Sequence, residues 1–138
     1  MPLAVVVQRD SALGQPFIES PTGAKSIKVL FTITASGSYP ANGDTLDLTA
    51  LFALAAGAPG SMVPTAALPL KVDIKSNKGT AQANLFVYNY LPGTTLANGK
   101  MQIYTGAAAQ TGLTEFAAGA YPAGVTGDVI QGEVLFAK

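Results

Sequence analysis

The sequence contains neither histidine nor cysteine, and these absences exclude most common kinds of catalytic and metal site. Histidine is the usual general base near neutral pH, so Ser-His-Asp and Cys-His catalysis cannot be built from this chain. Zinc and haem iron lose their most frequent ligands, and a disulfide framework is impossible. We therefore expect no catalytic residue, no metal ligand and no cofactor-binding residue, and we predict that the protein is not an enzyme.

Charged residues are also scarce. They make up 12% of the chain, whereas about a quarter is usual. Hydrophobic residues make up 49%, which argues against disorder, and such a surface is explained if other subunits cover much of it. The alternative is a soluble monomer with a threonine-rich surface. Basic and acidic residues balance to a net charge of zero, which indicates that nucleic acid is not a partner.

No segment has the length of a membrane span or the pattern of a secretory leader. The longest apolar stretch, Leu48 to Ala58, is interrupted by Thr49 and has only about half of the roughly 20 residues that a span requires. The apolar run from Leu3 to Val7 has no basic residue ahead of it and no small-residue cleavage site after it. We expect no membrane partner and a protein made in the cytoplasm.

Alternation of residue character with a period of two dominates the sequence and is typical of β-strands. The predicted strands are Leu3–Gln8, Ser26–Ser36, Leu68–Ser76, Thr80–Tyr90, Lys100–Thr105 and Asp128–Ala137, with a further short strand possible at Leu113–Ala117. A short helix is predicted over Leu48–Ala56, ended by Gly57. Short strands separated by turns predict one all-β domain over residues 1–138, a β-sandwich or jelly-roll-like barrel with at most one short helix.

The alternation also assigns side chains to faces of the predicted strands. The core-facing set of the clearest strand is Ile27, Val29, Phe31, Ile33 and Ala35, and Leu68, Leu70, Val72 and Ile74 repeat that pattern. The continuous apolar run at Leu3 predicts a strand covered on both faces. Asn77-Lys78-Gly79 suits a turn, so a β-hairpin is predicted between Leu68–Ser76 and Thr80–Tyr90.

Carboxylates are the main remaining groups that could support chemistry, and turn or surface roles explain them better. Asp73 lies on the polar face of a predicted strand, and Asp44 and Asp128 lie in predicted turns. Asn42-Gly43-Asp44 with Asp47 could offer oxygen ligands to Ca²⁺, but a calcium loop supplies several more at a defined spacing. An enzyme that uses a carboxylate pair is the catalytic alternative.

Three segments carry a resemblance to a known class of protein. They are Phe31–Leu48, Tyr88–Lys100 and Ala117–Asp128. In their succession of strand-like and turn-like segments they resemble small virion proteins of tailed bacteriophages, which are encoded near the major capsid protein. The resemblance implies a capsid decoration, or cement, protein that binds the assembled shell from outside and reinforces it. It implies the major capsid protein as partner and the capsid exterior as location, and it defines no functional residue.

We hypothesise from these observations a capsid-binding domain that also associates with itself, as a homotrimer or in a lattice. Residues 1–10 would form an N-terminal docking arm or edge strand. The proposed contact residues are Leu3, Val5 and Val7 in that arm and Phe86, Tyr88, Tyr90 and Tyr104 as aromatic anchors. The alternative for these rings is a second layer of the core.

A carbohydrate- or receptor-binding module, such as a fibre- or tail-associated domain, is the competing hypothesis. Sugar binding would use exposed aromatic rings beside polar loop residues, for which Tyr39, Asn42, Asp44 and Tyr121 are the candidates. The two tyrosines lie in similar four-residue segments, Ser38-Tyr39-Pro40-Ala41 and Ala120-Tyr121-Pro122-Ala123. We interpret both segments as turns in which tyrosine packs on proline; a shared binding role for the two tyrosines is the alternative.

Overall fold

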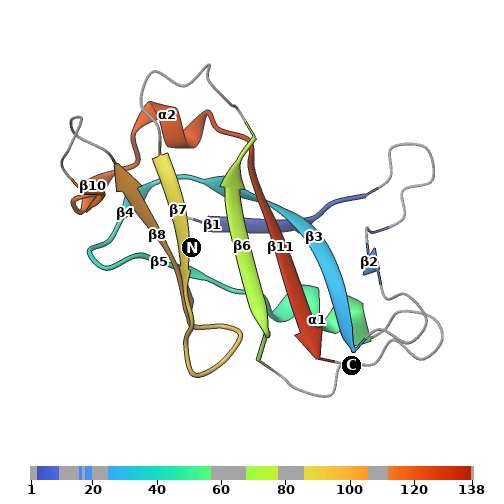
Figure 1. The fold of residues 1–138 in the computed structure, drawn as a ribbon. Coiled ribbons are helices and arrows are strands. Elements are labelled where there is room, and N and C mark those ends of the chain that lie inside the picture. The colour runs from blue at the N-terminus through green and yellow to red at the C-terminus, as the bar shows by residue number, and fades with distance from the viewer. Residues whose placement is uncertain are drawn as a thin grey trace.

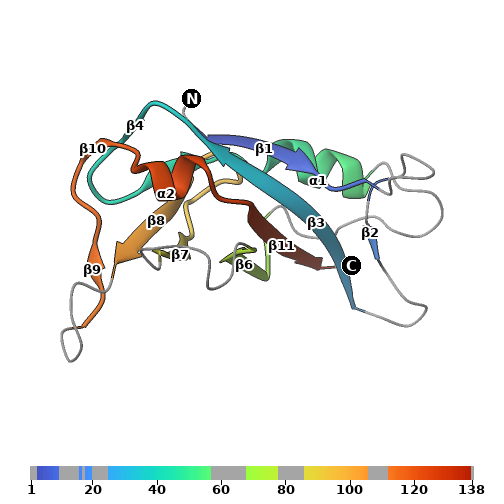
Figure 2. The same ribbon diagram turned by 90° about the horizontal axis from the view of Figure 1, so that it is seen from above.

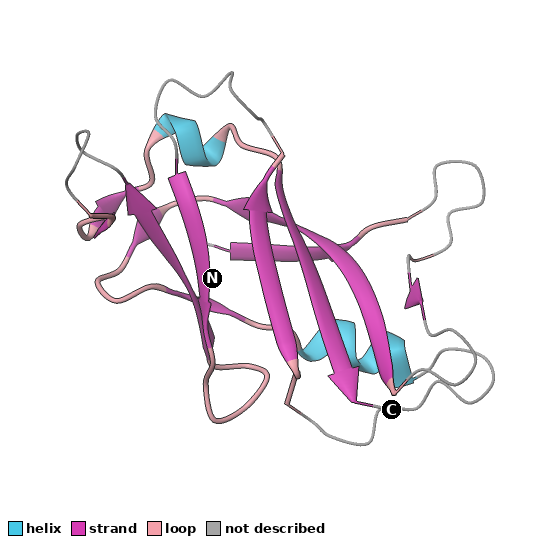
Figure 3. Ribbon diagram, viewed as in Figure 1, coloured by secondary structure: helices cyan, strands magenta, loops and turns pink. Residues whose placement is uncertain are grey.

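Antiparallel strands make up most of the described chain in the computed structural model, which describes residues 3–9, 16, 18–19, 25–56, 68–77, 86–105 and 112–137 (Figure 1, Figure 3). The larger sheet, here called the first sheet, has the order β1-β3-β11-β6, with β2 also paired to β3. Its strands are β1 (Leu3–Val7), β2 (Ile18–Glu19), β3 (Ser26–Ala35), β6 (Lys71–Ser76) and β11 (Ile130–Ala137).

The second sheet has the order β5-β8-β7, with β9 also paired to β8. A two-stranded ladder between β4 and β10 lies apart from both sheets. The strands are β4 (Ser38–Tyr39), β5 (Asp44–Leu46), β7 (Phe86–Leu91), β8 (Gly99–Thr105), β9 (Thr114–Glu115) and β10 (Gly119–Ala120). The all-β, sandwich-like class predicted from the alternation is therefore confirmed.

The core lies between the inner faces of the two sheets. The predicted inner set of β3, from Ile27 to Ala35, is buried throughout. Met101 and Ile103 of β8 and Ile130, Val134 and Phe136 of β11 are also fully or almost fully buried, as the alternation in those segments requires. Because one face of each strand is apolar and the other more polar, the register of pairing decides which side chains are left outside.

The two sheets approach each other along two seams without merging. β6 lies beside β7, and β1 approaches β5. Within the described chain no ladder joins either pair, so the strands form an open sandwich and not a closed barrel. Figure 2 shows β6 and β7 on one side of the molecule and β1 with α1 on the opposite side. At the first seam Asp128 accepts hydrogen bonds from Ser76 Oγ at 2.8 Å and Tyr88 Oη at 2.7 Å.

Two helices accompany the sheets. The predicted helix is present as α1 (Thr49–Ala56), and its Phe52 ring packs edge-on against Phe136 of β11, with centroids 5.3 Å apart. A second helix, α2 (Ala123–Thr126), lies outside the strands and the helix predicted from the sequence. It is a single turn that follows Pro122 and buries only Val125, too short to leave a 3.6-residue pattern in the sequence.

Strand β1 (Leu3–Val7) stands at one end of the described strand order of the first sheet. The predicted coverage of this strand on both faces is wrong, because Ala4 and Val6 are exposed. The β-hairpin proposed after Ser76 involves residues 78–85, which lie outside the described chain. The described part of its second strand, residues 86–90, belongs to β7 and pairs with β8, whereas β6 pairs with β11.

Candidate interaction surfaces

The proposed contact residues divide between the core and the surface. Leu3, Phe86 and Tyr88 are buried within this chain, and the Tyr88 side chain keeps only 6% exposure. Their burial in this chain favours the core alternative for the two rings, and Leu3 also belongs to the core. The physical reason is the register, which turns the even-numbered residues of β7 inward beside Met101 and Ile103.

The remaining contact candidates are only partly covered. Val5 and Val7 are half-buried and pack against the core, as does Tyr90. Burial raises the pKa of the Tyr90 hydroxyl. Tyr104 is half-buried on the opposite face of the second sheet. All four side chains therefore lie near the surface, and each is only partly exposed to solvent.

A small apolar groove opens where β6 begins and β7 ends, and we call it the seam groove. Its volume is about 240 Å³. It is lined by Leu68, Pro69, Leu70, Lys71, Val72, Tyr90, Pro92 and Gly93. Leu68 and Leu70 are exposed, Leu70 by 62%. The sequence pattern placed these two leucines on the inner face with Val72, and that expectation is wrong, because both precede β6 and their side chains are exposed. The Leu70 backbone N–H still donates a hydrogen bond to Leu135 O of β11 at 2.8 Å.

Among the described residues, the outer face of the second sheet carries no charge over its central part, and we call this part the neutral face. It consists of Val87, Asn89, Leu91, Gln102 and Tyr104. Val87 and Leu91 are each 43% exposed. Gln102 Oε1 accepts hydrogen bonds from Asn89 Nδ2 and from Tyr104 Oη, both at 3.2 Å. The face therefore combines two exposed apolar side chains with a short hydrogen-bonded row of amides and a phenol.

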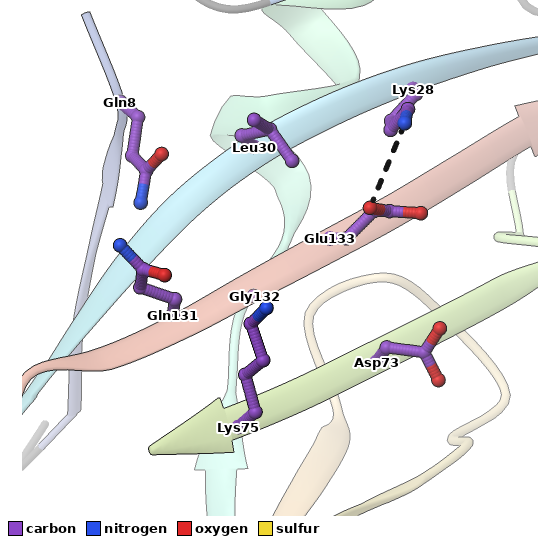
Figure 4. Close-up of a pocket in the computed structure, with 8 residues that line it drawn as sticks. All are labelled: Gln8, Lys28, Leu30, Asp73, Lys75, Gln131, Gly132 and Glu133. Carbon is purple, nitrogen blue, oxygen red and sulfur yellow. Dashed lines mark ion pairs between the residues drawn. The ribbon is translucent and has the colours of Figure 1, made fainter. Parts of the chain in front are cut away.

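The outer face of the first sheet is charged, in contrast to the neutral face. It is hollowed into a groove of about 490 Å³ (Figure 4). The groove is lined by Gln8, Lys28, Leu30, Asp73, Lys75, Gln131, Gly132 and Glu133. Figure 4 shows the Gln8 and Gln131 side chains close to each other and an ion pair between Lys28 and Glu133, which spans 3.8 Å.

Two carboxylates lie side by side on this charged face, because Asp73 and Glu133 are cross-strand partners. Each has a lysine nearby: Lys71 Nζ is 2.7 Å from Asp73 Oδ2, and Lys28 pairs with Glu133. The hydrogen bond to Asp73 raises the pKa of Lys71. This arrangement of mutually neutralised, solvent-accessible charges fits a hydrated sheet face, the role predicted for Asp73.

The four loop residues proposed for sugar binding form a different arrangement. Tyr39, Tyr121 and Asp44 are buried, Asp44 to 4% exposure. Tyr121 Oη donates to Asp44 Oδ2 at 2.6 Å, and the two tyrosine rings meet edge to face with centroids 5.7 Å apart. Asn42 is exposed and adopts a positive φ of 65° in the turn before β5. Buried rings cannot stack on a sugar, so these residues serve the core.

The two similar tyrosine-containing segments are neighbours in space. Gly119 and Ala120 of β10 pair with Tyr39 and Ser38 of β4. The Tyr39 hydroxyl accepts a hydrogen bond from the Ile103 backbone N–H at 3.1 Å and donates to Glu115 Oε1 at 2.8 Å. The sequence predicted packing of each tyrosine on proline; the structure shows that the two tyrosine rings also pack on each other.

Asp44 and Asp47, the candidate calcium ligands, have structural partners. Asp44 Oδ1 accepts a hydrogen bond from the Thr45 N–H at 2.8 Å, and Asp47 Oδ1 accepts one from the Thr49 N–H at 2.9 Å. The second contact caps the start of α1. Among the residues described, no group of three or more acidic side chains is arranged to hold a metal ion.

Comparison with known proteins adds no assignment: no family model, curated protein or solved structure matches this chain. In the described ranges neither helix is long and apolar enough to span a membrane.

Proposed function

We propose that the protein decorates the exterior of a phage capsid and stabilises it by binding the major capsid protein. The observation that carries the proposal is the unequal distribution of polarity on the surface. The outer face of the first sheet holds Lys28, Asp73, Lys75 and Glu133, while the seam groove exposes the apolar side chains of Leu68 and Leu70. A domain with one hydrated side and one apolar side is suited to lie on another protein while facing water.

The seam groove is the contact that we propose for the capsid protein. Its leucines can bury apolar area against a partner without any rearrangement of the core, since they are already outside it. Tyr90 and Pro92 provide a rigid wall, and rigid aromatic residues contribute strongly at interfaces. An extended apolar segment of the capsid protein is the partner that such a groove fits.

Binding to purified capsids tests this proposal. Full-length protein should co-sediment with mature shells of the phage concerned and remain in the supernatant without them. Leu70→Asp should weaken the binding at least tenfold, because a carboxylate would have to be desolvated in the groove. Val129→Asp is the matched control, since Val129 is also an exposed apolar residue, 49% accessible, but does not line the groove.

Two results would refute the proposal: no co-sedimentation by a folded protein, or equal binding by the Leu70 and Val129 variants. Copy number in purified virions gives a separate measurement. A decoration protein should be present in many copies, as the capsid protein is, whereas a fibre or tail component should be present in only a few.

The competing carbohydrate-binding hypothesis is weakened, because Tyr39 and Tyr121 are buried and engaged with carboxylates. A glycan-binding signal from the isolated protein would restore it, at a site other than these rings.

A further inference from the structure

The residues of the neutral face and its borders fall into three rows across the strands. The first row is Thr45, Lys100 and Leu91; the second is Gln102 and Asn89; the third is Glu115, Tyr104 and Val87. Among the residues of these three described rows, the only charges are Lys100 at one end of the face and Glu115 at the other. Each end also has one exposed aliphatic side chain, Leu91 or Val87.

This pattern is self-complementary, and we infer that the neutral face binds a second copy of the same chain about a two-fold axis. The axis lies parallel to the face and perpendicular to its strands. Rotation about it exchanges the first and third rows while β8 stays opposite β8 and β7 opposite β7. Such an isologous contact uses the same patch on both copies.

The rotation brings matching side chains together at every row. Leu91 of each copy faces Val87 of the other, which removes two exposed aliphatic pairs from water. Lys100 faces Tyr104, with Glu115 one strand further away, about 5 Å and within reach of a flexible lysine. Gln102 and Asn89 face their own copies, where amide groups can both donate and accept hydrogen bonds.

Charge selects this axis over the alternative. A two-fold axis parallel to the strands would place Lys100 of the two copies in the same row, where the ammonium groups repel each other. Lys100 has no ion pair with any described residue of its own chain. Glu115 is bound on one side by the Tyr39 hydroxyl, and its charge still attracts a cation. With the perpendicular axis, Lys100 of each copy lies near Glu115 of the other copy, so this attraction occurs twice in the dimer.

The inference does not depend on capsid binding, because the seam groove and the neutral face are lined by different residues. It also differs from the homotrimer expected from the sequence, since an isologous contact closes with two copies. The mass of the complex in solution therefore distinguishes the two.

Sedimentation of the full-length chain over a concentration series tests the inference. Wild type should reach the mass of a dimer. Val87→Lys and Leu91→Glu should each weaken association at least tenfold, because each places a charge against an aliphatic side chain. Val6→Lys is the control, an exposed valine on the outer face of the first sheet, 57% accessible, and should associate as wild type does.

Mixing the two single variants gives the sharpest result. In a heterodimer the new lysine of one chain faces the new glutamate of the other, while the second pair remains Leu91 with Val87. The mixture should therefore associate at concentrations at which each variant alone is largely monomeric. Positions 87 and 91 of one chain are about 13 Å apart along a strand, so the new charges cannot pair within it. A mixture that stays monomeric overturns the inference, as does a wild type that is monomeric or trimeric at every concentration.

Zero-length carbodiimide crosslinking of wild type avoids any effect of mutation on folding. A mixture of ¹⁴N- and ¹⁵N-labelled protein should yield a crosslink between Lys100 and Glu115 that joins labelled to unlabelled chains. Crosslinks confined to single chains would contradict the two-fold arrangement.

Discussion

The ring of Phe31 on β3 occupies the space where its cross-strand partner on β11, Gly132, would carry a side chain. A Cβ built at Gly132 would lie 2.2 Å from Cζ of Phe31, and Phe31 is fully buried. The two residues together fill one site of the core, which requires the absence of a side chain at position 132.

Gly132→Ala should therefore destabilise the protein, because either Phe31 or the β11 backbone must shift. Overpacking of this kind costs about 1–3 kcal/mol, and urea unfolding would measure the loss as a lower midpoint at unchanged slope. Gly112→Ala is the control, since nothing lies within 4 Å of a Cβ at that position. Equal stability of the two variants would show that the core yields at Phe31 without cost.

The sequence predicted the inner face of β3 correctly because its alternation is unbroken over Ser26–Ala35 and one face is entirely apolar. It did not reveal the partners of β6 and β7, since local patterning favours adjacent strands whereas the fold joins β6 to the distant β11. Pairing between strands far apart in the chain depends on tertiary packing, which no short pattern records.

The surface was harder to predict than the core. Phe86 and Tyr88 were proposed as contacts because they are aromatic, yet the side chains that β7 leaves exposed are Val87 and Leu91. Which face of a strand is inside is ambiguous when both faces carry apolar residues, and β7 is such a strand. The exposure of Leu70 was missed for a related reason: the alternating pattern already starts at Leu68, before the residue at which β6 begins.

Tyr121→Phe should destabilise the fold through Asp44. The substitution keeps the ring against Tyr39 but removes the donor to the buried Asp44 Oδ2. A buried acceptor left without its partner costs about 1–3 kcal/mol. Tyr104→Phe is the control, because Tyr104 is only half-buried and water can replace its bond to Gln102. Thermal unfolding of both variants measures the difference, and equal melting temperatures would show that Asp44 gains little from Tyr121.

Alkaline pH should destabilise the protein through Tyr39 and Tyr121. Burial raises the pKa of both hydroxyls above the ordinary 10.0, and the adjacent Glu115 and Asp44 raise it further. The unfolded chain then releases these protons first as pH rises. The stabilisation is fully present below about pH 10 and declines above it, since the folded state binds more protons there.

Unfolding free energy measured against pH would show this decline, and Tyr121→Phe separates the tyrosines from the lysines that titrate in the same range. The variant should lose stability less steeply than wild type at alkaline pH. A slope identical to that of wild type would mean that Tyr121 does not hold its proton in the folded state.

The contact between the two sheets at Asp128 can be tested by a double-mutant cycle. Asp128 accepts hydrogen bonds from Ser76 on the first sheet and Tyr88 on the second, across a seam where the described strands share no ladder. Ser76→Ala and Tyr88→Phe should each cost about 0.5–3 kcal/mol, the upper part of that range applying to bonds with a charged group. One cycle combines Asp128→Asn with Ser76→Ala, and the other combines Asp128→Asn with Tyr88→Phe. Each cycle should give a coupling energy above about 0.5 kcal/mol, because the three residues share one hydrogen-bond network. Additive effects would show that Asp128 acts independently of both hydroxyls. Apolar packing alone would then hold the two sheets together at this seam.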